Sequence, residues 1–232
     1  MALTTTVSGR RSLANWAGLG GVLYVALFII GGIVMFGGQP DSDAPPNKIR
    51  AYYADGGHRD RIGFGWIIIG LGLVAFLWFL AALRQRVRVL DGDGFLTALT
   101  TIGGAVYGAL ALAAISVYMG VKTMSDDTYN HTVYPGLIHA ADDVGYVLHA
   151  TGGAGAAVMI FAASFAALRA RVIPAWLGWL GFLAALGALA SIAFLPQILL
   201  ALWIVVAGIL LFLTPSAATP APPGYGAQSA PR

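Results

Sequence analysis

The chain has 232 residues, of which 58% are hydrophobic and 10% are charged, and its mean hydropathy is +0.78. Soluble domains carry about 25% charged residues, so this composition excludes an ordinary soluble domain and predicts an all-α, polytopic membrane protein in contact with a lipid bilayer. Cysteine is absent, which excludes disulfide bonds, thiolate metal sites and cysteine nucleophiles. The net charge is only +3, and we interpret the basic residues as marking orientation in the membrane rather than binding to nucleic acid.

Six apolar windows are long enough to cross a membrane, which takes about 20 mostly apolar residues. They cover roughly residues 15–37, 62–83, 98–120, 140–168, 173–193 and 197–214. The paired Arg10 and Arg11 before the first window are typical of a secretory signal, but this apolar stretch is too long for one and further spans follow it. We therefore interpret it as a retained first helix. The sequence predicts a six-helix transmembrane domain over residues 1–214.

The distribution of Lys and Arg predicts the orientation, because these residues concentrate in the cytoplasmic segments of membrane proteins. With the N-terminus in the cytoplasm, the inner segments contain Arg10, Arg11, Arg84, Arg86, Arg88, Arg169, Arg171 and Arg232, and the outer loops contain Lys48, Arg50, Arg59, Arg61 and Lys122. We therefore expect both termini in the cytoplasm and a multi-pass protein of the cytoplasmic membrane. The tail, residues 215–232, is rich in Pro, Ala and Gly and should be disordered.

Two outer loops, residues 38–61 and 121–139, are long enough to contain structure and are the candidate surfaces for a protein partner. In the first, APPNKIRAYYADGG has prolines where a helix can begin and a glycine pair where it can end. Ile49, Tyr52 and Tyr53 are spaced to share one helix face. This pattern predicts a short helix on the membrane surface, either a connector that buries its tyrosines at the interface or an element that binds a partner.

Small residues and a short repeat bear on how the spans pack. Gly104 and Gly108, and likewise Gly153 and Ala157, stand at the GxxxG spacing that lets helix backbones approach each other. They predict close packing within the bundle and leave open whether the chain forms a homo-oligomer. The segment AALRxRV occurs at 81–87 and again at 166–172, each time at the cytoplasmic end of a span. Duplication of a two-helix hairpin would explain this, and so would chance, because arginine is favoured at that interface.

The stretch HAADDVGYVLHA, residues 139–150, places polar side chains at the start of a long apolar run. On a helix, an arc of about 80° contains His139, Asp142, Tyr146 and His149, and Asp143 lies at its edge. In one interpretation the aspartates hydrate the helix entrance and His149 hydrogen-bonds to a neighbouring helix. In the other, these residues form half of a metal or proton site that His58, Asp60, His131 or Asp126 completes.

No other motif indicates chemistry. The sequence contains no HExxH, Walker A or GxSxG pattern, a haem site would need paired histidines in facing spans, and no cofactor is required. We favour a non-enzymatic accessory, structural or sensory membrane component. The alternative is a transporter or an ion- or metal-binding protein that uses the acidic and histidine-containing outer mouth of the fourth span. A membrane enzyme is the third hypothesis.

Three segments are similar to a family of six-helix integral membrane proteins common in actinobacteria, classed as a domain of unknown function. They are NKIRAYYADGGHRDRIG (47–63), FLWFLAALRQRVR (76–88) and ARVIPAWLGWLG (170–181). The resemblance covers most of residues 12–214 in layout and implies a six-helix bundle in the membrane. It implies no catalytic or binding residues, because the family has no established activity.

Overall fold

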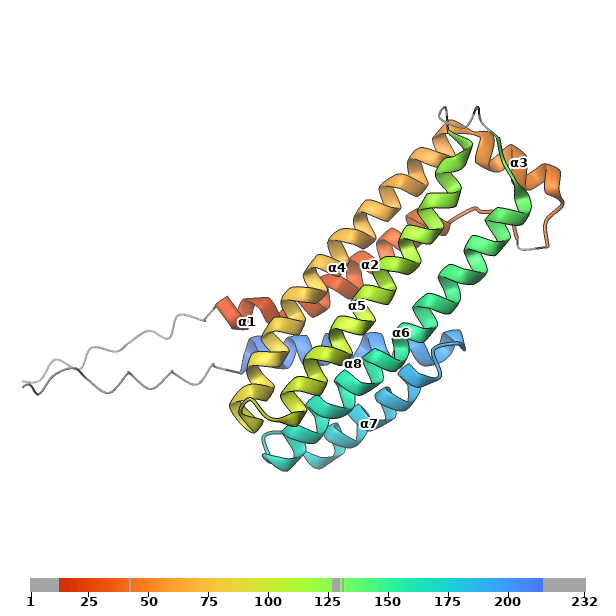
Figure 1. Ribbon diagram of the computed structural model, residues 1–232. Helices are drawn as coiled ribbons and strands as arrows, with labels where there is room; N and C mark the ends of the chain where they lie inside the picture. Colours follow the sequence, from red (N-terminus) through yellow and green to blue (C-terminus); the bar gives the residue numbers. More distant parts are fainter. Residues whose placement is uncertain (1–12, 42, 127–129, 131, 215–232) are drawn as a thin grey trace, which may run out of the picture.

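The computed structural model describes residues 13–41, 43–126, 130 and 132–214, and this part of the chain is all-helical. The predicted tail, 215–232, lies outside the described residues. Four helices pack in chain order into a long bundle: α2 (Gly20–Phe36), α4 (Gly56–Asp91), α5 (Phe95–Lys122) and α6 (Pro135–Arg169). The short α3 (Pro46–Ala54) lies at one end, and α7 (Ala175–Leu189) and α8 (Phe194–Leu213) cover the opposite end (Figure 1).

Within the described part of the chain, five helical segments are long and apolar enough to cross a membrane: Leu13–Phe36, Gly56–Asp91, Phe95–Gly120, Pro135–Arg169 and Pro196–Leu213. Their outward faces carry exposed apolar side chains such as Ile33 and Leu71, as contact with lipid requires. The predicted span 173–193 forms the 15-residue α7, which is about 22 Å long against a hydrocarbon core of about 30 Å. The helices therefore indicate a multi-pass membrane protein, and a sixth crossing stays a prediction.

The first predicted span is interrupted rather than continuous. Leu19 separates α1 (Leu13–Gly18) from α2, and the neighbouring glycines allow α8 to approach closely. A Cβ atom added to Gly18 would lie 3.0 Å from the carbonyl oxygen of Gly208. The buried side chain of Asn15 donates hydrogen bonds to the carbonyl oxygens of Leu211 and Thr214, at 3.0 and 2.6 Å. The first and last described helices therefore meet, and both ends of the described chain lie at the same end of the bundle.

The predicted short helix in the first loop is confirmed as α3. Its apolar face, Ile49, Tyr52 and Tyr53, is buried, as the spacing indicated. We expected the tyrosines at the lipid interface, but α3 packs on α4 and α6, so the protein itself covers them. The chain turns directly into α4 at Asp55, whose Oδ1 accepts a hydrogen bond from the His58 amide at 2.9 Å and so caps the new helix.

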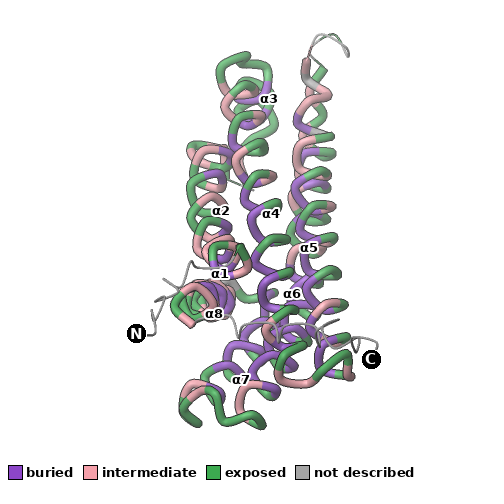
Figure 2. The backbone as a smooth tube through the Cα atoms, turned by 90° about the vertical axis from the view of Figure 1, so that its left-hand side faces the viewer, coloured by how far each residue is buried: buried purple, intermediate pink, exposed green. Residues whose placement is uncertain are grey.

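Glycine contacts confirm the predicted close packing, although the tightest backbone approach between α5 and α6 involves a different glycine from those predicted. A Cβ atom on Gly103 would lie 2.6 Å from the Gly155 carbonyl oxygen, and the reverse distance is also 2.6 Å. Gly104 and Gly108 instead accommodate side chains of α4. Gly31 of α2 and Gly65 of α4 pack reciprocally in the same way. Buried residues therefore follow the faces where the helices meet (Figure 2).

The two copies of AALRxRV adopt different conformations. Residues 81–87 lie within α4, which continues as a helix to Asp91. In the second copy α6 ends at Arg169, and Arg171 has a left-handed φ of 55°. The amide of Val172 donates to the Ala167 carbonyl at 3.2 Å, a bond that commonly closes a helix C-terminus. Both copies lie at the end of the bundle opposite α3, here named the arginine end, and their common origin stays a prediction.

Candidate functional site

The most unusual side chain is that of Lys122, the last residue of α5, which is only 1% exposed. Its ammonium group lies among the rings of three aromatic residues. Nζ is 5.0 Å from the ring centroid of Phe36, 5.3 Å from that of Tyr118 and 5.8 Å from that of Tyr53. Ring faces attract a cation within about 6 Å, and the attraction strengthens when water is excluded. The aromatic contacts therefore offset part of the cost of burying this charge.

Polar groups complete the surroundings of the ammonium. Lys122 Nζ donates a hydrogen bond to Gln39 Oε1 at 3.2 Å and forms an ion pair with Asp142 Oδ1 at 3.5 Å. Gln39 Oε1 also accepts from the Tyr53 hydroxyl at 3.3 Å. We name these residues the lysine box: Phe36, Gln39, Tyr53, Tyr118, Lys122 and Asp142. The box ties together the end of α2, the following loop, α3, α5 and α6.

Burial shifts the pKa values of Lys122 and Tyr53 in the box, because water is excluded from their surroundings. Burial lowers the pKa of Lys122, and the opposing effect of the Asp142 charge is smaller. Burial also raises the pKa of the Tyr53 hydroxyl, and the Asp142 charge adds to that effect. Among the described residues, Asp142 Oδ1 has no partner at hydrogen-bond distance, because its 3.5 Å contact with Lys122 is longer than a normal hydrogen bond of about 2.7–3.2 Å. Chemically, the Lys122–Asp142 pair can hold together the helices at the end of the bundle where α3 lies, exchange a proton or bind a small ion.

A second set of contacts fixes the first loop onto the start of α4. Arg61 donates from Nη2 to the Gly37 carbonyl oxygen and, at 2.7 Å, to the Tyr52 hydroxyl. Gly38, with a φ of 70°, provides the left-handed turn that directs the loop past Arg61. The Tyr52 ring stacks on His58, with ring centroids 4.1 Å apart. The residues Arg61 and His58 thus hold α3 through Tyr52, which belongs to the buried face of that helix.

The structure separates the residues of the predicted HAADDVGYVLHA site. Asp142 pairs with Lys122, Asp143 is exposed, and His139 is half-buried. His149 stacks on Phe28 at 5.5 Å between ring centroids, with the Tyr107 ring 6.2 Å away.

The proposed partners of this site lie elsewhere. His58 is at the corner between α3 and α4, and His131 lies outside the described residues. Within the described ranges no three His, Asp or Glu side chains lie close enough to hold a metal ion. A shared helix face does not bring these groups together, because Asp142 contacts Lys122 at the end of α5, whereas His149 contacts Phe28 of α2 and Tyr107 further along α5. The metal hypothesis therefore stays a prediction.

Sequence reasoning missed the lysine box. It placed Lys122 among the basic residues of the outer loops, because a lysine after an apolar run is the usual pattern of a helix end. It also missed a hydroxyl pair inside the bundle, where the oxygens of Tyr24 of α2 and Tyr107 of α5 are 2.5 Å apart and both side chains are buried. The one available signal for the box was the buried face predicted for Tyr52 and Tyr53.

No family model, curated protein or solved structure matches the chain. The geometry described above therefore carries the functional argument.

Proposed function

We propose that the protein crosses the cytoplasmic membrane six times, with both termini in the cytoplasm. Among the described residues, five helical segments have the length and composition of spans, and the hydrogen bonds from Asn15 to the end of α8 bring the two ends of this part of the chain together. A chain returns to the side where it began only after an even number of crossings, and α7 supplies the sixth. The excess of Lys and Arg at the arginine end supports the cytoplasmic assignment.

Within that membrane the protein acts as a non-enzymatic accessory component that presents its outer cap to a protein partner. The outer cap comprises the loops 38–61 and 121–139. The observation that carries this proposal is the lysine box, which fixes α3 to three other helices through a buried cation. Moving a charged group out of water costs several kcal/mol, so we expect a fully buried lysine where it holds a helix in a defined position. A helix such as α3 that is already held in place loses less conformational entropy when it binds a partner.

The face of α3 turned away from the box is polar and exposed, and includes Asn47, Lys48 and Arg50. Crosslinking from this face tests the proposal. A photoreactive amino acid at position 50 should capture one protein reproducibly, and reciprocal purification of that protein should recover the chain. The matched control is position 74 of α4, where Val74 is also exposed but lies in the middle of an apolar span.

The Lys122→Met variant links this result to the box. The methionine keeps the length of the side chain and removes the charge, so the cap should loosen and the yield from position 50 should fall. Capture of the same mixture from positions 50 and 74, with no change in the variant, would contradict the docking function. The comparison of crosslinking yields requires that the Lys122→Met variant inserts stably, as judged by its size-exclusion profile.

The second candidate function is ion or proton transport, favoured by the ion pair between buried Lys122 and the partly exposed Asp142. Ionisable groups inside membrane proteins often mark ion pathways and proton relays. Transport predicts a proton- or metal-dependent flux in proteoliposomes that Lys122→Met, Asp142→Asn and His149→Ala each abolish without loss of insertion. Absence of flux with the unaltered protein, or equal flux in all three variants, would exclude this function and leave the docking function in place.

A further inference from the structure

A cavity of about 230 Å³ lies at the arginine end, between α4, α6, α7 and α8. Most of its walls are apolar, formed by side chains such as Leu83, Val87, Ala207 and Leu210, and Trp203 also lines it. Its lining includes the polar or charged side chains of Arg86, Ser164 and Thr214. Trp203 precedes Thr214 by eleven positions, so the cavity extends about 16 Å along α8, starting from the end of the helix.

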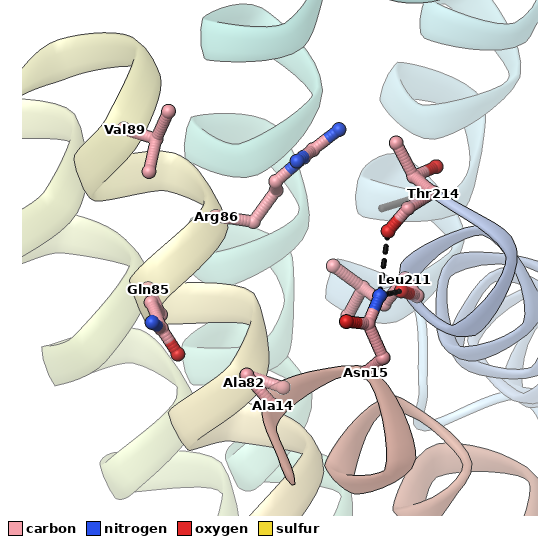
Figure 3. Close-up of a pocket in the computed structure, with 8 residues that line it drawn as sticks. All are labelled: Ala14, Asn15, Ala82, Gln85, Arg86, Val89, Leu211 and Thr214. Atoms are coloured by element: carbon pink, nitrogen blue, oxygen red, sulfur yellow. Dashed lines mark hydrogen bonds between the residues drawn. The ribbon is translucent and has the colours of Figure 1, made fainter. Parts of the chain in front are cut away.

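A second, smaller pocket of about 50 Å³ adjoins this cavity. Its lining includes the polar side chains of Asn15, Gln85, Arg86 and Thr214, and Figure 3 shows Arg86 extending from α4 toward Thr214 at the end of α8. A water molecule needs about 10–15 Å³ of such space, so this pocket holds several water-sized groups. Arg86, Leu211 and Thr214 line both spaces. A small compartment with both polar and apolar lining residues thus shares part of its wall with a mostly apolar compartment, and Arg86 belongs to the shared wall.

Such a pair of compartments matches an amphiphile with an anionic head. The larger cavity exceeds the roughly 150 Å³ that holds a benzene molecule, and is below the roughly 300–1,000 Å³ of a pocket for a complete drug-sized ligand. It therefore suits part of one hydrocarbon chain. Arginine presents five N–H donors in a planar fork that suits a phosphate. Basic pockets between transmembrane helices on the cytoplasmic side are known to bind anionic lipid headgroups.

We propose that these two compartments bind one anionic phospholipid, with its phosphate at Arg86 and one acyl chain in the cavity that leads to Trp203. The positive charge of Arg86 favours an anionic phospholipid over the chain's own tail, residues 215–232, which follows Thr214 directly. That segment contains no Asp or Glu, so its side chains offer no anion to the guanidinium. The site is independent of the proposed docking function, because the outer cap lies at the other end of the bundle.

Binding of phosphatidylglycerol to the full chain in mild detergent, followed by native mass spectrometry, tests the proposal. Phosphatidylcholine with the same acyl chains is the reference lipid. The unaltered protein should retain phosphatidylglycerol in preference, and Arg86→Gln should weaken that binding by about tenfold or more, because a hydrogen bond to a charged group is lost. Arg86→Lys should keep much of the preference. The matched control is Arg84→Gln, which removes the same charge from an exposed position on the same helix.

Equal losses in Arg86→Gln and Arg84→Gln would overturn the proposal, since binding would then follow surface charge alone. Ala207→Leu narrows the apolar cavity without changing any charge and should also weaken phosphatidylglycerol binding. Unchanged binding in that variant would refute the acyl-chain site. Removal of residues 215–232 should leave the affinity unaltered. A large gain in lipid affinity on removal would identify the tail as the occupant and overturn the proposal. Thermal unfolding of each variant verifies that the bundle is intact.

Discussion

The contact between α5 and α6 predicts that one methyl group at Gly103 destabilises the bundle. In Gly103→Ala the new Cβ would lie 2.6 Å from the Gly155 carbonyl oxygen and 2.7 Å from the Met159 amide nitrogen. Ordinary van der Waals contact begins at 3.4 Å, and both neighbours are backbone atoms that cannot rotate away. The two helices must therefore separate along their contact. Overpacking of this kind costs about 1–3 kcal/mol in the free energy of unfolding.

Gly70→Ala in α4 is the matched control, because a Cβ there meets nothing within 4 Å. Both substitutions gain the same helix propensity, about 0.8–1 kcal/mol in water, so their difference isolates the steric term. Reversible unfolding in mixed detergent micelles should show Gly103→Ala less stable than Gly70→Ala by about 1–3 kcal/mol. Equal stability of the two variants would refute the backbone contact between α5 and α6, and with it the helix arrangement that positions Lys122.

Three further predictions concern other contacts. Because burial lowers the pKa of Lys122, the unfolded chain binds more protons than the folded protein in the pH window that ends near the ordinary lysine pKa of about 10.4. Stability should therefore rise with pH in that window, and Lys122→Met should lose the rise; thermal unfolding in which both proteins show the same slope would contradict this. For the hydroxyl pair, Tyr24→Phe and Tyr107→Phe should each cost about 1 kcal/mol, and the double variant should cost little more than either; strictly additive losses would argue against the bond. Asn15→Ala should lower the free energy of unfolding by about 1–2 kcal/mol through loss of two hydrogen bonds to the end of α8, and an unchanged value would contradict that contact.

The positions of the long apolar helices were predictable because such a helix depends on local composition. A run of apolar residues identifies a helix regardless of what it packs against, and the i, i+3, i+4 spacing of Ile49, Tyr52 and Tyr53 identified α3 for the same reason. The boundaries were less accurate. Polar ends such as those of α4 continue as helix beyond the apolar window, and Pro174 delays the start of α7. Composition does not report either effect.

The lysine box was not predictable, because its parts are distant in the sequence. Phe36, Tyr53 and Tyr118 belong to three elements and meet only after α2, α3 and α5 have packed. The predicted site on the polar face of α6 stays a prediction, and the sequence could not give the partners of its residues for a related reason. A helix face shows which side chains share a direction, but Asp142 and His149 are about two turns apart and have different neighbours, Lys122 for the one and Phe28 and Tyr107 for the other.

Cysteine labelling tests the membrane arrangement most directly, because the chain contains no cysteine and each introduced thiol is unique. The chosen positions are Ala51 in α3, Ala193 between α7 and α8, and Thr214 after α8. In intact cells a membrane-impermeant maleimide should label Ala51→Cys and Ala193→Cys, and should label Thr214→Cys only after the membrane is opened. Labelling of Thr214→Cys in intact cells, or protection of Ala193→Cys while Ala51→Cys reacts, would contradict six crossings with cytoplasmic ends.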